Sequence, residues 1–434
     1  MQENLLTAPV RRTYFKYLAA AFGSSMITCI YGIVDTAVVG HAIGPVGSAA
    51  LAVVMPIWTI FYSLGLLVGI GGSVAYSFYM GQGKKEKANA YFTLSLGFCA
   101  LLALIVWGGI ALFEEEMLRF FGADDVLLAL AKSYMLPVLA VIPAFPFTQL
   151  LAAFLRNDHV PQLATLAVIC GGVFNIFGDF FFVFYLDYGI LGAGLATSMG
   201  AVISITVMLT HFVSKNNGLK LVRVYGILHK AKTVIHFGAA SFISDVGMGV
   251  VVMLFNRSIM TYFGTDALAV YGVLAQMAVV VQAASYGIGQ AAQPMLSVNY
   301  GASALDRVDE IKHWAFLTAA VFGLVWLGLF MAWPNAFVYF FMKPTAEVLA
   351  IAPSILRTYA VGFLFVAFNV VATYYFQSVM RPKEALYASL ARGFVLCGVL
   401  IFVLPAIFGP SLIWWVMPIT ETLVCAYCVL QIKK

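Results

Sequence analysis

The sequence predicts an all-α membrane protein with twelve transmembrane helices arranged as two six-helix lobes. Of its 434 residues, 62% are hydrophobic and only 10% are charged, whereas soluble domains average about 25% charged residues. Apolar segments of at least roughly 20 residues, the length of helix that crosses a bilayer, recur from one end of the chain to the other. The two halves also carry similar motifs in the same order, which indicates an internal repeat.

The six spans of the first half are separated by loops of characteristic charge. Basic residues precede the first span and follow the second, fourth and sixth, and a run of acidic residues follows the third. Because no long alternation of polar and apolar residues suggests a β-barrel, every span is expected to be a helix. We expect these helices at residues 14–38, 50–80, 89–113, 126–153, 161–186 and 189–213.

The second half repeats this plan, with basic residues after the eighth, tenth and twelfth spans. We expect its helices at residues 232–262, 267–299, 312–341, 347–379, 384–407 and 410–431. Several spans exceed the minimum length, which predicts tilt or kinks. The expected organisation is an N-lobe at 1–213, a basic cytoplasmic linker at 214–231 and a C-lobe at 232–434, with no loop long enough for a soluble domain.

Lysine and arginine predict the orientation of the chain. In short loops they mark the cytoplasmic side, and here they gather at one set of helix ends, which places both termini in the cytoplasm. The same rule accounts for the net charge of +5, so nucleic-acid binding need not be invoked. The basic start precedes a full-length span without a small-residue cleavage pattern, so no cleavable signal peptide is expected. Short loops favour a bacterial plasma membrane, that is, the inner membrane.

Three pairs of motifs define the repeat. GSAALAV at 47–53 matches GTDALAV at 264–270, and GIGGSVAYSFYMG at 69–81 matches GIGQAAQPMLSVNYG at 287–301. The segments that begin at Val160 and Arg381 align their prolines, and the members of each pair lie 217 to 221 residues apart. Six spans are an even number, so both halves insert in the same orientation as a parallel repeat. Two similar bundles that rock against each other suit alternating access, which favours a transporter.

Acidic residues inside the predicted spans are the candidates for function. An ionised side chain at mid-membrane is costly, so such residues tend to face a cavity. The four are Asp35, Asp179, Asp245 and Glu421. Asn175 lies one helical turn before Asp179, and Thr197 lies on the following span. If these side chains converge with Asp35, their oxygen atoms could bind a small cation, or the two carboxylates could share one proton. Hydrogen bonding between helices is the alternative, especially for Asp245 and Glu421.

Further polar residues could line a central cavity. Gln276 and Gln282 lie on broadly one side of the eighth span, and Asn369 on the tenth could face them. Tyr31 on the first span and Tyr134 on the fourth could face the same cavity as the first-span acid. These side chains could equally join neighbouring helices. The deep arginine of the eleventh span, at position 392, has no partner that the sequence identifies.

Four motifs resemble the multidrug and toxic compound extrusion (MATE) family of cation-coupled antiporters. They are YGIVDTAVVG, GIGGSVAYSFYMGQGKKEKA, NIFGDFFFVFYLDYGILGAGLAT and GIGQAAQPMLSVNYGA. Each is weak alone, but they occur in order over essentially the whole chain. The resemblance implies a twelve-helix, two-lobed fold that exports organic cations and other amphipathic compounds, driven by inward flow of H+ or Na+.

The resemblance also implies roles for individual residues. The positions that match the family's N-lobe ion site are Asp35, Asn175, Asp179 and Thr197, and the tyrosines beside that site match Tyr31 and Tyr134. Some members use a seventh-helix acidic residue, more often Glu, near which Asp245 falls. Two family prolines are absent: Ala20 replaces the one in the first helix, and Phe180 replaces the one after the fifth-span acid.

Other classes fit the residues less well. A lipid-linked oligosaccharide flippase of the same superfamily, the alternative function, would be expected to line its cavity with Arg and Lys, whereas the inward charges here are mainly acidic. A major-facilitator transporter usually carries an Asp–Arg pair after its second span, and GQGKKEKANAY has none. An intramembrane enzyme would need a nucleophile–base pair or clustered histidines, and the six histidines are scattered. We therefore expect a monomeric transporter in the lipid bilayer, with small amphipathic, cationic substrates and no cofactor beyond H+ or Na+.

Overall fold

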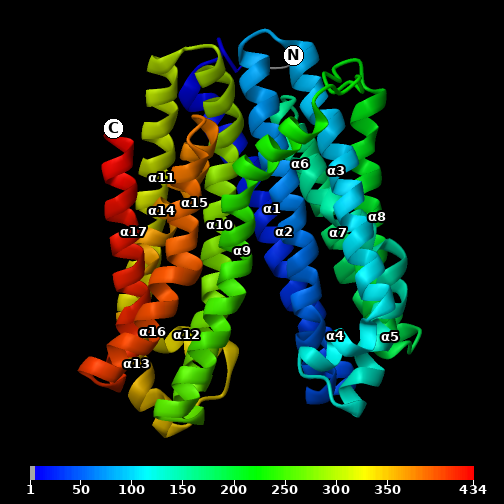
Figure 1. The fold of residues 1–434 in the computed structure, drawn as a ribbon. Coiled ribbons are helices and arrows are strands. Elements are labelled where there is room, and N and C mark those ends of the chain that lie inside the picture. Colours follow the sequence, from blue (N-terminus) through cyan, green and yellow to red (C-terminus); the bar gives the residue numbers. More distant parts are fainter. Residues whose placement is uncertain (1–4) are drawn as a thin grey trace.

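The computed structural model describes residues 5–434, and within that range it is helical with no β-strand (Figure 1). Twelve helical segments of the described chain are long and apolar enough to cross a membrane, as the sequence predicts. They form two lobes that converge at the end of the molecule where the N-terminus lies and diverge toward the opposite end (Figure 1).

The N-lobe contains the first six spans, and two of them are interrupted. Its elements are α1 (Val10–Ile43), α2 (Pro45–Gly81), α3 (Lys85–Leu112), α4 (Glu114–Phe120), α5 (Asp125–Val141), η1 (Ile142–Ala144), α6 (Phe145–Asn157), α7 (Pro161–Gly178), η2 (Asp179–Tyr185), α8 (Gly189–Leu209) and η3 (Thr210–Val213). The fourth span tightens into a 3₁₀ turn at η1, where Pro143 removes a helical hydrogen-bond donor. The fifth span widens into a π-helical segment that begins at Asp179.

The C-lobe repeats these features. Its elements are α9 (Ile227–Phe263), α10 (Thr265–Gly301), α11 (Leu305–Ala332), α12 (Pro334–Phe341), α13 (Ala346–Ala360), α14 (Phe363–Ser378), α15 (Pro382–Leu390), η4 (Ala391–Val395), α16 (Leu396–Phe408), η5 (Pro410–Trp415) and α17 (Val416–Ile432). The short helices α4 and α12 occupy corresponding places, and the π-helical segment η4 lies in the eleventh span as η2 lies in the fifth.

Several boundaries differ from the sequence prediction by a few residues, and two of the differences have a clear local cause. The expected ninth span at 312–341 is divided, because α11 ends at Ala332 and Pro334 starts the separate helix α12. Proline suits the first turn of a helix, where its missing N–H would have no partner. The seventh span also begins inside the expected linker, since α9 starts at Ile227 directly after Gly226, whose φ of 67° ends the preceding chain in a left-handed conformation.

The first helix of each lobe packs on both lobes. Near its start, α1 places Tyr14 in a core that contains Ile311 of the C-lobe, whereas Val39 near its end packs within the N-lobe. Similarly, α9 places Val234 in an N-lobe core and Phe255 in the C-lobe core. A change in the packing of either helix therefore reaches both lobes.

Glycines allow the lobes to meet closely at their converging end. A Cβ added at Gly81 of α2 would lie 2.1 Å from a backbone carbonyl oxygen of α10, and a Cβ at Gly301 of α10 would lie 2.1 Å from one of α2. These two glycines correspond to each other in the sequence repeat. The contact between α2 and α10 is thus reciprocal, as expected for two lobes related by a parallel repeat.

Candidate functional site

The predicted ion-site residues come from four neighbouring elements of the N-lobe. Asp35 lies on α1, Asn175 on α7, Asp179 at the start of η2, and Thr197 on α8. Asn175 Nδ2 donates a hydrogen bond of 3.1 Å to Thr197 Oγ1. Asp35 lies close enough to Asp179 for their charges to interact. The structure therefore brings these four side chains together.

Small residues explain why α7 and α8 approach closely enough for this contact. A Cβ at Gly171 of α7 would lie 2.4 Å from the carbonyl oxygen of Gly200, and a Cβ at Gly200 would lie 2.7 Å from that of Gly171. Only glycine fits both positions, and small residues at such interfaces are typical of close helix packing in membranes. The glycine contact lies one turn from Asn175 and Thr197 on the two helices.

Both predicted tyrosines lie beside the cluster. The hydroxyl of Tyr134, which is buried on α5, lies 3.4 Å from Thr197 Oγ1 and also faces the carboxylate of Asp35. Tyr31, one turn before Asp35 on α1, lines a cavity of about 70 Å³ together with Asn175 and Thr197. The cavity therefore has room for water or a small ion beside Asn175 and Thr197, and neither Asp35 nor Asp179 is among the residues that line it.

Four buried oxygen atoms of the cluster have no hydrogen-bond partner among residues 5–434. They are Asp35 Oδ1, Asn175 Oδ1 and both carboxylate oxygens of Asp179. Asp179 is 0% exposed and Asn175 is 3% exposed, so neither side chain obtains partners from the bulk solvent. Buried polar atoms are nearly always hydrogen-bonded, and exceptions call for a physical explanation. The donor set, two carboxylates with an amide and a hydroxyl oxygen, fits a proton or a hard cation.

Asp245 lies apart from this cluster, where the two lobes meet. It is half-buried on α9, and its Oδ2 accepts a hydrogen bond of 2.6 Å from Ser63 Oγ of α2. Gln276, predicted to line a central cavity, is exposed on α10. It lines neither the cavity beside Asn175 nor a second cavity of about 60 Å³ that lies in the C-lobe. The structure therefore does not place Gln276 beside the other predicted polar residues.

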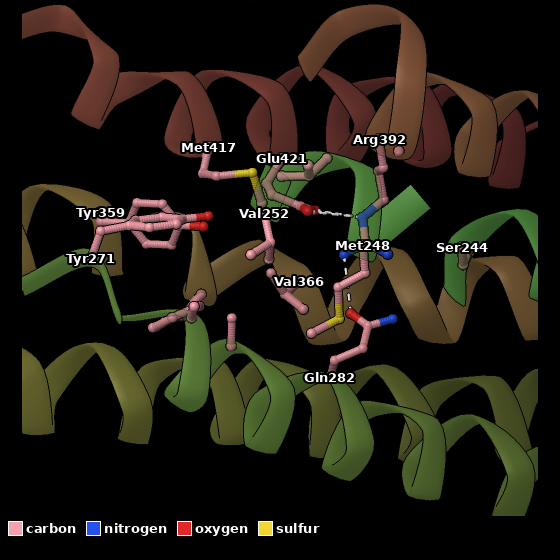
Figure 2. A pocket seen from close by; sticks show the side chains of 15 residues that line it. Ser244, Met248, Val252, Tyr271, Gln282, Tyr359, Val366, Arg392, Met417 and Glu421 are labelled. Carbon is pink, nitrogen blue, oxygen red and sulfur yellow. Dashed lines mark hydrogen bonds and ion pairs between the residues drawn. The ribbon is translucent and has the colours of Figure 1, made fainter. Parts of the chain in front are cut away.

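A second polar cluster lies in the C-lobe and contains the three remaining candidates, Gln282, Asn369 and Glu421. Arg392 of η4 forms an ion pair of 2.8 Å with Glu421 of α17, and both side chains are largely buried. Asn369 of α14 donates to Glu421 Oε2 at 2.7 Å, and Gln282 of α10 accepts from Arg392 Nη2 at 3.3 Å. Figure 2 shows Arg392, Glu421 and Gln282 converging beside a cavity.

The pairing of Arg392 with Glu421 was not predicted. The sequence contains one signal for it: each residue is an isolated charge in an apolar span, and the two spans are neighbours in the chain. Because an unpaired charge in a membrane is costly, opposite charges on adjacent spans are natural partners. Asn369 also proves to be a fully buried partner of Glu421 and does not line the cavity.

Comparisons with known proteins identify the same fold. The family model described as MatE matches residues 20–181 and 239–403. The multidrug export protein MepA of Staphylococcus haemolyticus (strain JCSC1435) is 23% identical over 409 residues, which cover 93% of this chain and 88% of that protein. A crystal structure of MATE in complex with MaD5 superposes with a TM-score of 0.90 at 19% identity, covering 100% of this chain and 98% of that one. An outward-facing multidrug resistance MATE family transporter of the MOP superfamily gives 0.87 at 21% identity, with 99% and 97% covered.

Proposed function

The chain belongs to the MatE family, and we propose that it is a secondary active antiporter that exports organic cations and other amphipathic compounds in exchange for H+ or Na+. Its family makes it a multi-pass membrane transporter and not an enzyme. The relatives described as multidrug export proteins support the export of drugs. The coupling ion, the antiport mode and the cationic nature of the cargo belong to the proposal.

The unpartnered oxygen atoms of the N-lobe cluster carry this proposal. A carboxylate that is fully buried and lacks a donor costs several kcal/mol, so Asp179 is expected to be neutral or paired with a cation for part of the cycle. Asp35 adds a second acid within electrostatic reach. Two neighbouring carboxylates cannot both stay charged cheaply, and taking up one positive charge relieves this repulsion.

Each residue has a distinct part in binding the ion. Asp35 and Asp179 supply the negative charge. Asn175 Oδ1 supplies a neutral oxygen that accepts no hydrogen bond from the described residues. Thr197 Oγ1 already accepts a hydrogen bond from Asn175 and faces the hydroxyl of Tyr134, so it orients both side chains. With H+ as the coupling ion, the two carboxylates share the proton, and with Na+ their oxygens and that of the amide are the ligands.

Ion binding would reach the cargo path through α1. Uptake of a cation draws Asp35 toward η2 and α8, which changes how the second half of α1 packs in the N-lobe. The first half of α1 packs against α10 and α11 of the C-lobe, as the shared core of Tyr14 and Ile311 shows. Movement of one helix that both lobes hold is a direct route from the ion site to the arrangement of the lobes. A cationic cargo would also compete with the ion for the same negative charge.

The proposal includes a setting in the cell. We place the protein as a monomer in the bacterial inner membrane, with both termini in the cytoplasm, because lysine and arginine gather at the loops of that end. Large exposed apolar side chains, among them Leu101, Ile105 and Val399, suit contact with lipid tails. The converging end of the lobes would then face the cytoplasm, and their diverging end the outside (Figure 1).

Dye efflux from proteoliposomes tests the proposal. The purified protein is reconstituted with a trapped cationic dye, and a pH gradient or a Na+ gradient is applied separately. We expect one of the gradients to drive efflux without ATP, and an ionophore that collapses that gradient to stop it. Efflux at the same rate without any gradient, or no efflux under either, would contradict antiport. Movement of a fluorescent lipid-linked sugar under the same conditions would instead favour the flippase.

A further inference from the structure

The C-lobe contains a cavity that the ion site does not use. Its volume is about 60 Å³, and Tyr271, Tyr359 and Met248 form much of its apolar wall, while Arg392 and Glu421 form its polar side (Figure 2). This volume holds a few water molecules or one polar end group, and it does not hold a whole drug-sized compound. A ligand there would insert one end and leave the rest outside.

The guanidinium of Arg392 has hydrogen-bonding capacity left over beside this cavity. Its Nε donates to both oxygens of Glu421 at 2.8 and 3.0 Å, and its Nη2 donates to Gln282 Oε1 at 3.3 Å. A guanidinium has five N–H groups, and no described residue accepts from Nη1. The edge formed by Nη1 and Nη2 is therefore available to a ligand, and that edge matches the two oxygens of a carboxylate.

The charge of this cavity differs from that of the N-lobe cluster. Glu421 is already neutralised by Arg392, and Asn369 further satisfies its Oε2. A cation entering here would meet a carboxylate that is fully engaged and a guanidinium that repels it. A carboxylate would find free donors on a positive group that stays paired on its other side. Because the Arg392–Glu421 pair has no net charge, the C-lobe cavity offers hydrogen-bond donors to a carboxylate, whereas the N-lobe cluster offers unpartnered oxygen atoms to a cation.

We propose that the C-lobe cavity binds the carboxylate end of amphipathic compounds, with the carboxylate on the free edge of Arg392 and the rest of the compound outside the cavity. The site gives the carboxylate of such compounds a place of binding in the C-lobe. It depends on the proposed function only in treating the bound compound as cargo, because the binding itself requires no ion gradient.

A matched pair of dyes tests the ligand class. Rhodamine 110 carries a carboxylate on a cationic ring system, and rhodamine 123 is its methyl ester, so the two differ in the group that Arg392 would bind. Their affinities for the purified full-length protein are measured by fluorescence polarisation in detergent. The site predicts tighter binding of rhodamine 110, by roughly tenfold or more, as expected for a bidentate charge-assisted contact.

Two variants locate the contact. Arg392→Gln combined with Glu421→Gln removes both charges together and leaves no unpaired one, so the fold is expected to tolerate it. This variant should lose the preference for rhodamine 110 while its affinity for rhodamine 123 changes less than about threefold. Met248→Phe narrows the cavity, leaves the ion pair in place and should have the same effect. The control removes a comparable pair at the surface, Arg119→Gln with Glu115→Gln, and should preserve the preference.

The outcomes separate this site from the proposed antiport. Equal affinity of the native protein for both dyes would overturn the inference, and so would a preference that survives in both C-lobe variants. If ion-driven efflux fails but the preference depends on Arg392, the site stands and the antiport does not. If ion-driven efflux is observed and the preference for rhodamine 110 is absent, the antiport is supported and the carboxylate site is contradicted.

Discussion

Ser63 of the N-lobe donates a hydrogen bond of 2.6 Å to Asp245 of the C-lobe, which joins the two lobes through a carboxylate. The bond connects α2 and α9, which also pack closely at Gly71 and Gly238, where an added Cβ would lie 2.0 and 1.8 Å from a backbone carbonyl oxygen of the other helix. Because alternating access requires the lobes to move relative to each other, a polar bond between them is a contact that the cycle can break and form again. Asp245 also carries a charge that a cationic cargo would meet.

Two substitutions separate the charge of Asp245 from its hydrogen bond. Asp245→Asn keeps an acceptor for Ser63 and removes the charge, whereas Ser63→Ala keeps the charge and removes the donor. We expect Asp245→Asn to slow the efflux of cationic dyes several-fold and to leave neutral compounds less affected. Ser63→Ala should change all substrates alike. Efflux rates of a substrate panel in proteoliposomes provide the measurement, and indifference of every substrate to Asp245→Asn would assign that residue to packing alone.

Asp35→Asn and Asp179→Asn should each reduce ion-driven efflux to the background rate. The substitution conserves shape and removes the charge that takes up the coupling ion, so the protein should remain folded in detergent. Because these carboxyl groups are expected to be neutral or paired with a cation, exchange for a neutral amide should leave the melting temperature in detergent close to that of the native protein. Efflux in proteoliposomes and thermal melting in detergent together measure these effects.

Asp187→Asn provides a matched control for these two variants. Asp187 is an exposed acid in the connection that follows η2, and its φ of 56° is one that asparagine also adopts readily. It should pump like the native protein. Wild-type efflux by either Asp35→Asn or Asp179→Asn would remove that residue from the ion site.

Some features of the fold produce a clear pattern in the sequence and others do not, and this decides how much of the fold could be predicted. The twelve spans are visible as long apolar segments, and the two lobes are visible as an internal repeat. Composition and spacing therefore predict the architecture. Breaks inside spans are harder to predict. No residue pattern marks the π-helical segment that begins at Asp179, and only Pro334 marks the division of the ninth span. Local hydrogen bonding decides such breaks, and the average hydropathy of a segment does not record it.

The candidate site shows the same limit. Asp35 and Asp179 are conspicuous because acids are rare in lipid, and their proximity to each other agrees with the expected convergence. Their role in ion binding is part of the proposed function. The identity of the partner of Arg392 depends on how the eleventh and twelfth spans are rotated about their axes. Hydropathy does not report this rotation, so the partner could not be predicted. Gln276 and Gln282 lie on the same predicted side of one helix, yet only Gln282 reaches the C-lobe cavity.

The buried pair of Arg392 and Glu421 predicts a non-additive effect on stability. Their side chains are 11% and 1% exposed, so removing one partner leaves an uncompensated buried charge. Breaking such a pair typically costs about 3–5 kcal/mol, whereas replacing both partners is often nearly neutral. Arg392→Gln alone should lower the melting temperature in detergent clearly, and adding Glu421→Gln should restore most of the loss. Equal or additive losses would contradict a tightly paired arrangement.

The reciprocal glycines Gly81 and Gly301 predict that the lobes need close contact at their converging end. A methyl group at Gly301 would lie 2.1 Å from a carbonyl oxygen of α2, a distance that requires the backbones to separate. Since α2 and α10 belong to different lobes, Gly301→Ala should disfavour the arrangement in which this end is closed. Efflux should fall about tenfold or more if that arrangement is an obligatory state, as a penalty of only 1.4 kcal/mol on it already changes its population tenfold.

Hydrogen exchange distinguishes this effect from general unfolding. In Gly301→Ala, amide exchange should rise in the last turns of α2 and α10, while the N-lobe cluster around Thr197 stays protected. Gly97→Ala on α3 is the control, because nothing lies within 4 Å of a Cβ at that position and alanine is the better helix former. Native efflux and unchanged exchange in Gly301→Ala would mean that the two helices can separate without consequence, and that closure at this end does not depend on the glycine contact.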